Sequence, residues 1–207
     1  MVPSMCPDDP RCVIVSTQVM DRFFALLALG VGAAALFAAG LLVASGYSTG
    51  AAELRVRLQE SLRGRELSLA FVVAIVATLG SLYMSEIAHR EPCRLCWFQR
   101  IAMYPLALTL GIAAWRRDRL VRVYALPMAA IGGVIAAYHY LIQQFPNLES
   151  GSCSATVPCT ADYVWEFGFV TIPYMALSAF AIIIVLLTVA HVNDRSIDAP
   201  ADSKVLL

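Results

Sequence analysis

Long apolar stretches, separated by short polar ones, set the pattern of the chain. Each stretch holds 19 to 24 residues, enough to cross the roughly 30 Å hydrocarbon core of a bilayer as a helix. They span residues 23–46, 67–85, 97–115, 123–145 and 167–190. Arg100 is the one charged side chain inside them, and His139 is the one histidine. The pattern predicts five membrane-spanning helices and an all-α, polytopic helix bundle.

Basic residues collect in alternate polar segments. Residues 47–66 and the turn 116–122 hold four arginines each, and the tail 191–207 adds Arg195 and Lys204, whereas residues 146–166 hold none. Because cytoplasmic loops collect Arg and Lys, this pattern predicts an outside tail over 1–22, a cytoplasmic amphipathic link over 47–66 and a cytoplasmic tail over 191–207. Cleavage of 23–46 as a signal peptide would reverse this polarity, so we interpret that stretch as a retained helix.

Composition agrees with a membrane protein. Of 207 residues, 59% are hydrophobic and only 14% are charged, where a soluble domain carries about a quarter, and mean hydropathy is +0.71. These values exclude a disordered chain and an ordinary soluble enzyme. Fifteen basic and fifteen acidic residues cancel, so no net field attracts a nucleic acid.

Six cysteines fall into three pairs, and all of them lie in segments predicted to face outward. The pairs are Cys6 with Cys12, Cys93 with Cys96, and Cys153 with Cys159. Disulfides persist in oxidising compartments. The distribution of arginines and the positions of the cysteines therefore agree. Both indicate that the thiols lie outside the cytoplasm and have a redox or a structural role there.

The C-x-x-C pair, Cys93 and Cys96, stands where the third apolar stretch begins. A helix amino terminus and the nearby Arg90, Arg94 and Arg100 are expected to stabilise a thiolate there. Redox chemistry is the favoured interpretation, and a structural bridge or half of a zinc site is the alternative. Arg100, one helical turn beyond Cys96, needs a polar partner in the apolar zone, either a quinone carbonyl or a phospholipid head group.

The second pair lies in the outer segment 146–166, with five residues between Cys153 and Cys159. Gly, Ser and Pro make this segment pliant. A disulfide here is placed to exchange with a soluble thiol protein and pass electrons to the membrane-edge pair. A simple loop staple is the alternative.

Several motifs together resemble the DsbB/BdbC family of disulfide-bond formation proteins, four-helix membrane oxidases that pass electrons from thiol oxidases to quinone. The likeness covers about residues 67–190, with the C-x-x-C loop first and the second cysteine pair later. The motifs are Pro-Cys93-Arg-Leu-Cys96-Trp-Phe-Gln-Arg100, Met103-Tyr104-Pro105, Tyr138-His139-Tyr140, Pro158-Cys159, Trp165-Glu166-Phe167-Gly168-Phe169 and Ile172-Pro173.

This resemblance implies a DsbB-like four-helix bundle over 67–190 with one additional N-terminal helix. It implies that Cys96 faces a quinone, ubiquinone or menaquinone, with Cys93 as its resolving partner. Arg100 then polarises the quinone. His139 lies close to the quinone or, alternatively, anchors its helix at the membrane interface. Trp97, Phe98, Tyr104 and Trp165 form an aromatic wall around the ring or, alternatively, belong to the aromatic belt of the membrane interface.

The resemblance further implies a plasma-membrane thiol:quinone oxidoreductase that reoxidises a DsbA/BdbD-like thiol oxidase. Cys153 would be the sulfur attacked by that partner, and Cys159 would exchange onto the C-x-x-C pair. The short spacing of this second pair leaves open which sulfur is attacked first. Cys6 and Cys12 form a tail disulfide or a further relay, or Met20 is the true start.

Three other classes of protein share parts of this pattern. Vitamin K epoxide reductases also couple thiols to quinones, but their loop cysteines precede the C-x-x-C pair. CcdA-like carriers place cysteines within helices. A non-enzymatic alternative binds zinc through four outer thiolates, those of Cys93, Cys96, Cys153 and Cys159.

Overall fold

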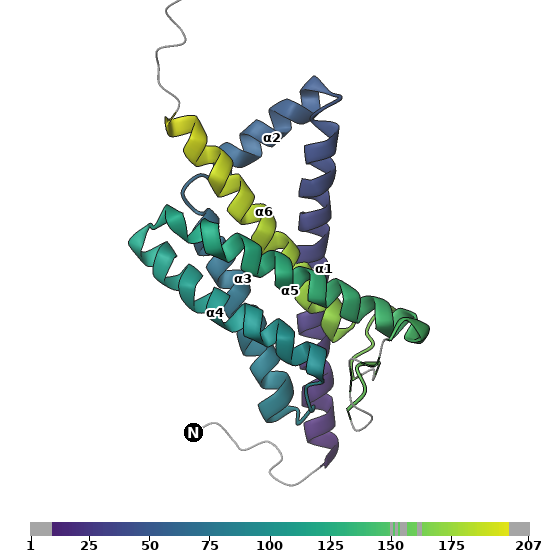
Figure 1. Ribbon diagram of the computed structural model, residues 1–207. Helices are drawn as coiled ribbons and strands as arrows, with labels where there is room; N and C mark the ends of the chain where they lie inside the picture. The colour runs from purple at the N-terminus through teal and green to yellow at the C-terminus, as the bar shows by residue number, and fades with distance from the viewer. Residues whose placement is uncertain (1–9, 150, 152, 154–156, 161–162, 199–207) are drawn as a thin grey trace, which may run out of the picture.

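The computed structural model describes residues 10–149, 151, 153, 157–160 and 163–198, with side chains described within residues 17–192 (Figure 1). It is helical, and no strand occurs in the described ranges. The helices are α1 (Pro10–Ala44), α2 (Thr49–Leu62), α3 (Glu66–Leu82), the π-helical turn η1 (Tyr83–Ile87), α4 (Arg94–Arg116), the 3-10 turn η2 (Arg119–Val121), α5 (Arg122–Gln144), the 3-10 turn η3 (Pro146–Leu148) and α6 (Ile172–Asp198).

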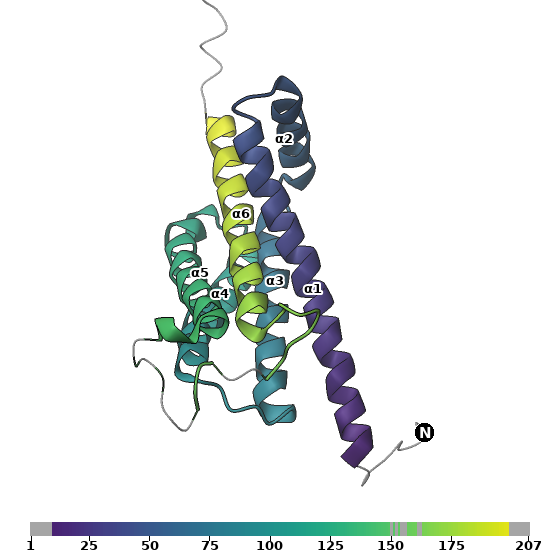
Figure 2. The ribbon, with the colours of Figure 1, turned by 90° about the vertical axis from the view of Figure 1, so that its right-hand side faces the viewer.

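Helices α3 to α6 form a closed four-helix bundle, and α1 packs on its outside. In the bundle α3 contacts α4, α4 contacts α5, α5 contacts α6, and α6 returns to α3. Helix α1 lies along α6, and its amino-terminal end projects beyond the bundle (Figure 2). Helix α2 follows α1 as a short arm that contacts it.

Within the described part of the chain, five helices are long and apolar enough to cross a membrane, as predicted. They span Thr17–Ala44, Glu66–Ile87, Arg94–Arg116, Arg119–Gln144 and Ile172–Val192. The predicted all-α polytopic bundle is thus confirmed. Helix α1 begins at Pro10, ahead of the apolar stretch, because residues 10–22 contain neither Gly nor any Pro after the first position to interrupt a helix.

Large side chains from two helices fill the centre of the bundle against small residues from the other two. Leu106 and Leu110 of α4 and Phe180, Ile183 and Leu187 of α6 are fully or almost fully buried. Their neighbours on α3 and α5 are alanines and glycines: Ala70, Ala74, Ala125, Ala129, Gly132 and Ala136. This complementarity lets the helix backbones approach closely, which drives helix association where the surroundings are as apolar as the core.

The two ends of the bundle carry different chemistry. Helix α2, the α4–α5 turn and the carboxyl end of α6 lie toward one end, and the α3–α4 and α5–α6 loops lie at the other (Figure 1). The first end carries the arginine-rich segments 47–66 and 116–122. The second brings the C-x-x-C pair and the later cysteine pair together.

We predict that Gly132→Ala destabilises the bundle. A Cβ at Gly132 would lie within contact of the buried Phe180 ring, which has no room to withdraw. Overpacking of this kind costs about 1–3 kcal/mol, more than the gain in helix propensity. At Gly133 a Cβ would make an ordinary contact, 3.5 Å from Cβ of Phe180. Thermal unfolding in detergent should therefore show a lower Tm for Gly132→Ala alone; equal Tm values for both variants would contradict this packing.

Candidate functional site

Cys93 is the N-cap of α4, and its sulfur takes the place of the usual capping oxygen. Its backbone is extended, and its Sγ accepts the N–H of Cys96 at 3.4 Å. His89, with φ 51°, turns the chain after η1, and Pro92 leads into the cap. The C-x-x-C spacing is the N-cap to N3 spacing of a capping box. It therefore places both sulfurs at the positive end of the α4 dipole.

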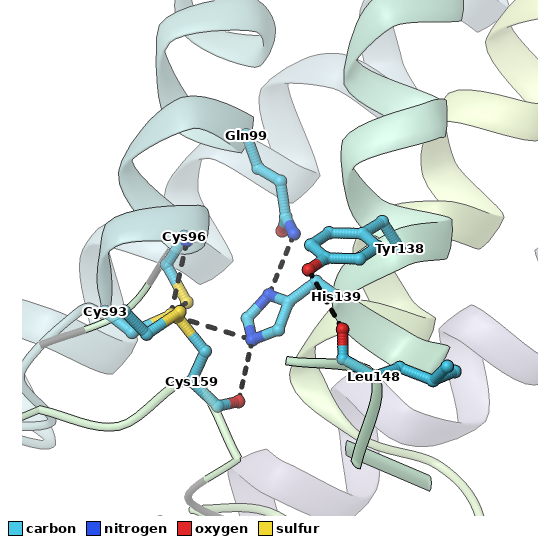
Figure 3. The surroundings of a disulfide bond; sticks show 8 residues. Cys93, Cys96, Gln99, Tyr138, His139, Leu148 and Cys159 are labelled. Atoms are coloured by element: carbon cyan, nitrogen blue, oxygen red, sulfur yellow. Dashed lines mark hydrogen bonds between the residues drawn. A yellow bond between two sulfur atoms is a disulfide. The ribbon is translucent and has the colours of Figure 1, made fainter. Parts of the chain in front are cut away.

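Three side chains converge at this cap (Figure 3). The Sγ atoms of Cys93 and Cys96 lie 3.1 Å apart as free thiols. Nε2 of His139, from α5, lies 3.6 Å from Sγ of Cys93. Cys93 and His139 are buried, and Cys96 is half-buried.

His139 is held in one orientation by two further contacts. The side-chain nitrogen of Gln99, one turn beyond Cys96 on α4, lies 3.0 Å from Nδ1. When this amide donates to Nδ1, the ring proton resides on Nε2. That N–H then points to the carbonyl oxygen of Cys159 at 3.1 Å and to the sulfur of Cys93. The histidine thus links the two cysteine pairs.

This arrangement holds the pKa of the Cys93 thiol well below its ordinary value. The main cause is the hydrogen bond with the Cys96 thiol, followed by the hydrogen bond with His139 and by the Cys96 backbone N–H, while burial opposes them. These contacts favour the ionised form of the Cys93 sulfur, which is the form that reacts in disulfide exchange.

The later pair forms a disulfide beside this cluster. Cys153 and Cys159 are bonded to each other. Cys159 is 1% exposed and belongs to one buried group with Cys93, Leu95 and Ile142, whereas Cys153 packs at the edge of that group and is partly accessible. One sulfur of the disulfide thus faces the C-x-x-C pair, and the other is nearer to solvent.

A largely apolar cavity of about 300 Å³ opens beside Cys96. Helices α1, α3, α4 and α6 contribute its walls, with Val72, Val76 and Met175 among the apolar residues. Cys96, Gln99, Arg100 and Ser81 bring polar groups to it. The volume is at the lower end of the range for small-molecule sites, about 300–1,000 Å³.

Arg100 is buried on the wall of this cavity and is held by α3. Its Nε donates to Oγ of Ser81, and one terminal nitrogen donates to the carbonyl oxygen of Ser81, both at 2.9 Å. The guanidinium also lies 5.2 Å from the centre of the Trp97 ring. Among the described residues no other acceptor takes its remaining N–H groups, so they are available to a ligand carbonyl.

The predicted site residues are distributed over two adjoining places. Cys93 and His139 belong to the sulfur cluster, and His139 does not line the large cavity. Arg100 lines the cavity. Trp97 is 52% exposed and supports Arg100 from outside the cavity.

The expected aromatic wall is only partly present. Tyr104 lines the cavity, and its hydroxyl oxygen lies 3.4 Å from Oγ of Ser81. Phe98 and Trp165 do not line it; Phe98 lies beneath the guanidinium of Arg94. Most of the apolar side chains that line the cavity are aliphatic.

The expectation that Arg90 stabilises the thiolate is wrong. Its guanidinium forms two hydrogen bonds to the Asp21 carboxylate, at 2.6 and 2.9 Å, and contacts Sδ of Met84. A carboxylate from a helix outside the bundle therefore neutralises it. The stabilising contacts on Cys93 come from Cys96 and His139 instead.

Sequence reasoning missed Gln99, Ser81 and Asp21 as parts of the site. Gln99 carried a signal, because it is a polar residue one turn after Cys96 inside an apolar stretch. Ser81 and Asp21 meet their partners only through the packing of separate helices. Cys6 lies outside the described residues, and of Cys12 only the backbone, within α1, is described.

The sulfur cluster also bears on metal binding. Sγ of Cys93, Sγ of Cys96 and Nε2 of His139 all lie within 4.8 Å of one another. The alternative of four zinc-binding thiolates does not fit this structure, because Cys153 and Cys159 are joined to each other.

Comparison with known proteins identifies the family. Residues 65–190, more than half of the chain, match the family described as "Disulfide bond formation protein DsbB". The chain belongs to the DsbB family. The matched residues contain α3, α4, α5, the first part of α6 and both cysteine pairs described above, while α1 and α2 lie outside them.

Individual relatives agree with this assignment. The chain is 51% identical over 122 residues to "Disulfide bond formation protein C" of Bacillus subtilis, covering 58% of this chain and 88% of that protein. It is 50% identical over 120 residues to "Probable disulfide formation protein C 1" of Bacillus anthracis, covering 58% and 86%. No solved structure matches the chain significantly. The protein is thus a multi-pass membrane disulfide bond formation protein.

We predict that the low pKa of Cys93 depends on Cys96 first and on His139 second. In the reduced protein, the absorbance of the Cys93 thiolate is the part of the thiolate absorbance that the Cys93→Ser variant lacks. This part should titrate below neutral pH. Cys96→Ala should move this titration upward most, and His139→Asn should move it upward less, because each removes a contact that favours the ionised sulfur. His191→Asn, at the far end of α6, is the control and should change nothing. A parent titration above pH 8 would contradict the assignment.

Proposed function

We propose that this protein is a thiol:quinone oxidoreductase that reoxidises a DsbA/BdbD-like extracytoplasmic thiol oxidase. The observation that carries the proposal is the position of Cys96. Its sulfur lies 3.1 Å from that of Cys93 and also lines the cavity that holds Arg100. Cys96 therefore connects a reactive sulfur pair to a site for a small apolar acceptor.

The partner enters at Cys153, the more accessible sulfur of its disulfide. A thiolate of the reduced partner attacks Cys153, the bond to Cys159 breaks, and Cys159 leaves as a thiolate. Buried beside Cys93, Cys159 then attacks that sulfur in the oxidised C-x-x-C pair, and Cys96 leaves.

Two further exchanges complete the transfer. The second thiol of the partner attacks its mixed disulfide with Cys153, so the partner departs oxidised. Cys153 then attacks Cys159, which restores their disulfide and frees Cys93. Two electrons have moved from the partner to Cys93 and Cys96, and the sulfur bonding that results is the one in the structure.

The residues around the cavity fit a quinone. Its walls are apolar, as a ring with an isoprenoid tail requires, and Arg100 presents N–H groups to a carbonyl oxygen. A bound quinone, ubiquinone or menaquinone, would supply an acceptor for the two electrons released when Cys93 and Cys96 form their disulfide, and the two protons of the quinol would come from the thiols and from solvent. Arg100 would hold and polarise the carbonyl, Ser81 fixes Arg100, and Cys96 is the cysteine that lines the cavity. His139 and Gln99 orient Cys93 for that step.

The orientation in the membrane follows from the distribution of charge. The end of the bundle with segments 47–66 and 116–122 carries eight arginines and is assigned to the cytoplasm. The cysteine end then faces the oxidising exterior of the plasma membrane. The amino terminus lies outside and the carboxyl terminus inside.

Substitution of single cysteines should separate the two halves of the reaction. With a reduced thioredoxin-like oxidase and a soluble quinone, Cys96→Ser should abolish turnover. Cys153→Ser should also stop oxidation of the partner. When a small dithiol first reduces the C-x-x-C pair of the Cys153→Ser variant, this variant should still reduce quinone. Electron transfer to quinone needs only Cys93 and Cys96. Quinone reduction at the parent rate by Cys96→Ser would contradict the mechanism.

We also predict that Arg100→Gln lowers quinone reduction about 10²–10³-fold, the loss typical of one donor to a developing oxyanion. Arg94→Gln is the matched control, since Arg94 begins the same helix but does not line the cavity. Stopped-flow measurement of thiol oxidation by quinone distinguishes the two. Equal rates for the variants would remove Arg100 from the acceptor site.

A further inference from the structure

Helix α1 is an integral, packed part of the molecule although the family match begins at residue 65. Ala25, Ala28, Gly32 and Ala35 follow one another at spacings of three and four and are buried. A Cβ at Gly32 would lie 3.0 Å from the hydroxyl oxygen of Ser178 on α6. Small residues in this register let α1 lie close against α6.

The adjoining face of α1, which shares Ala28 with this row, forms a wall of the cavity beside Cys96. Phe24, Leu27, Ala28 and Val31 all line it. The Phe24 ring crosses to α3, where a Cβ at Gly80 would lie 3.0 Å from it. Helix α1 thus supplies one wall of the cavity, and α3, α4 and α6 supply the others.

A buried ion pair fixes α1 to the loop that precedes the C-x-x-C pair. Arg90 and Asp21 meet through two hydrogen bonds, with only 17% and 8% of their side chains exposed. The Arg90 backbone N–H also donates to the carbonyl oxygen of Met84 in η1. Arg90 and Met84 both line the cavity. Charges this deeply placed in an apolar region need each other, so the pair ties α1 to the mouth of the cavity.

We propose that α1 is a specificity element of the quinone site. Its side chains at Leu27, Ala28 and Val31 set the affinity and the tail selectivity for the quinone, and Asp21 positions this wall through Arg90. The inference rests on the proposed quinone chemistry and extends it, because the α1 residues concerned lie outside the matched family segment.

The test measures equilibrium binding of short-tailed and long-tailed ubiquinone and menaquinone to the full chain in lipid nanodiscs. Ala28→Phe fills the cavity from the α1 side and should weaken binding at least about tenfold, most of all for long tails. Ala33→Phe is the matched control, because Ala33 lies on an exposed face of α1 and does not line the cavity. Exchange of the Cys153–Cys159 disulfide with a small dithiol serves as the fold check. Should Ala28→Phe fail that check, Leu27→Ala replaces it, with about tenfold weaker binding expected.

The outcomes separate this inference from the proposed function. Weaker binding in Ala28→Phe but not in Ala33→Phe supports the role of α1. Parent-like binding in Ala28→Phe, with binding lost in Arg100→Gln, overturns the role of α1 and leaves the quinone site standing. Parent-like binding in both Ala28→Phe and Arg100→Gln overturns the quinone site as well.

A double-mutant cycle tests the positioning role of Asp21. Asp21→Asn and Arg90→Gln should each weaken quinone binding several-fold, and the double variant should lose no more than either one, because one interaction is removed in all three. Arg22→Gln is the control. Arg22 is exposed, and its contact with the Glu166 carboxylate, at 3.6 Å, is a weak surface pair. Additive losses in the double variant would overturn the positioning role.

Discussion

A cysteine sulfur at the cap of a membrane helix is the interaction on which the rest of the site depends. Cys93 caps α4, and the capping distance brings the Cys96 backbone N–H and thiol to the same sulfur. The helix terminus, a hydrogen-bonded thiol and His139 then favour negative charge at a place where apolar helices meet. A stabilised thiolate lowers the free energy of the reduced C-x-x-C pair. The oxidised pair is therefore a stronger acceptor of electrons in thiol–disulfide exchange.

Two polar groups near this sulfur are held by partners from other helices. Gln99 of α4 orients His139 of α5, and Ser81 of α3 holds Arg100 of α4. Buried polar groups are tolerated in an apolar region only when they are satisfied in this way. The contacts therefore define the relative positions of the helices as well as the chemistry of the site.

The sequence was sufficient for the membrane-spanning helices and for the grouping of Cys93 with Cys96 and of Cys153 with Cys159. Apolar length alone located the five spans, and motif spacing identified the C-x-x-C pair and Arg100. Long-range pairing was beyond reach: Arg90 stands three residues from Cys93, yet its charge is satisfied by Asp21, sixty-nine residues away. Gly30, Gly32 and Gly40 look alike in sequence, but only Gly32 meets a neighbouring helix. Such differences depend on how helices rotate against each other, which no local pattern specifies.

The central claim is that the two cysteine pairs exchange directly through Cys93 and Cys159, which share one buried cluster. The most direct test is mass-spectrometric disulfide mapping of the non-reduced Cys96→Ser, Cys153→Ser double variant, extracted under conditions that preserve the fold. Our account predicts a peptide linked between Cys93 and Cys159. Recovery of both cysteines as free thiols from folded, oxidised protein would contradict it.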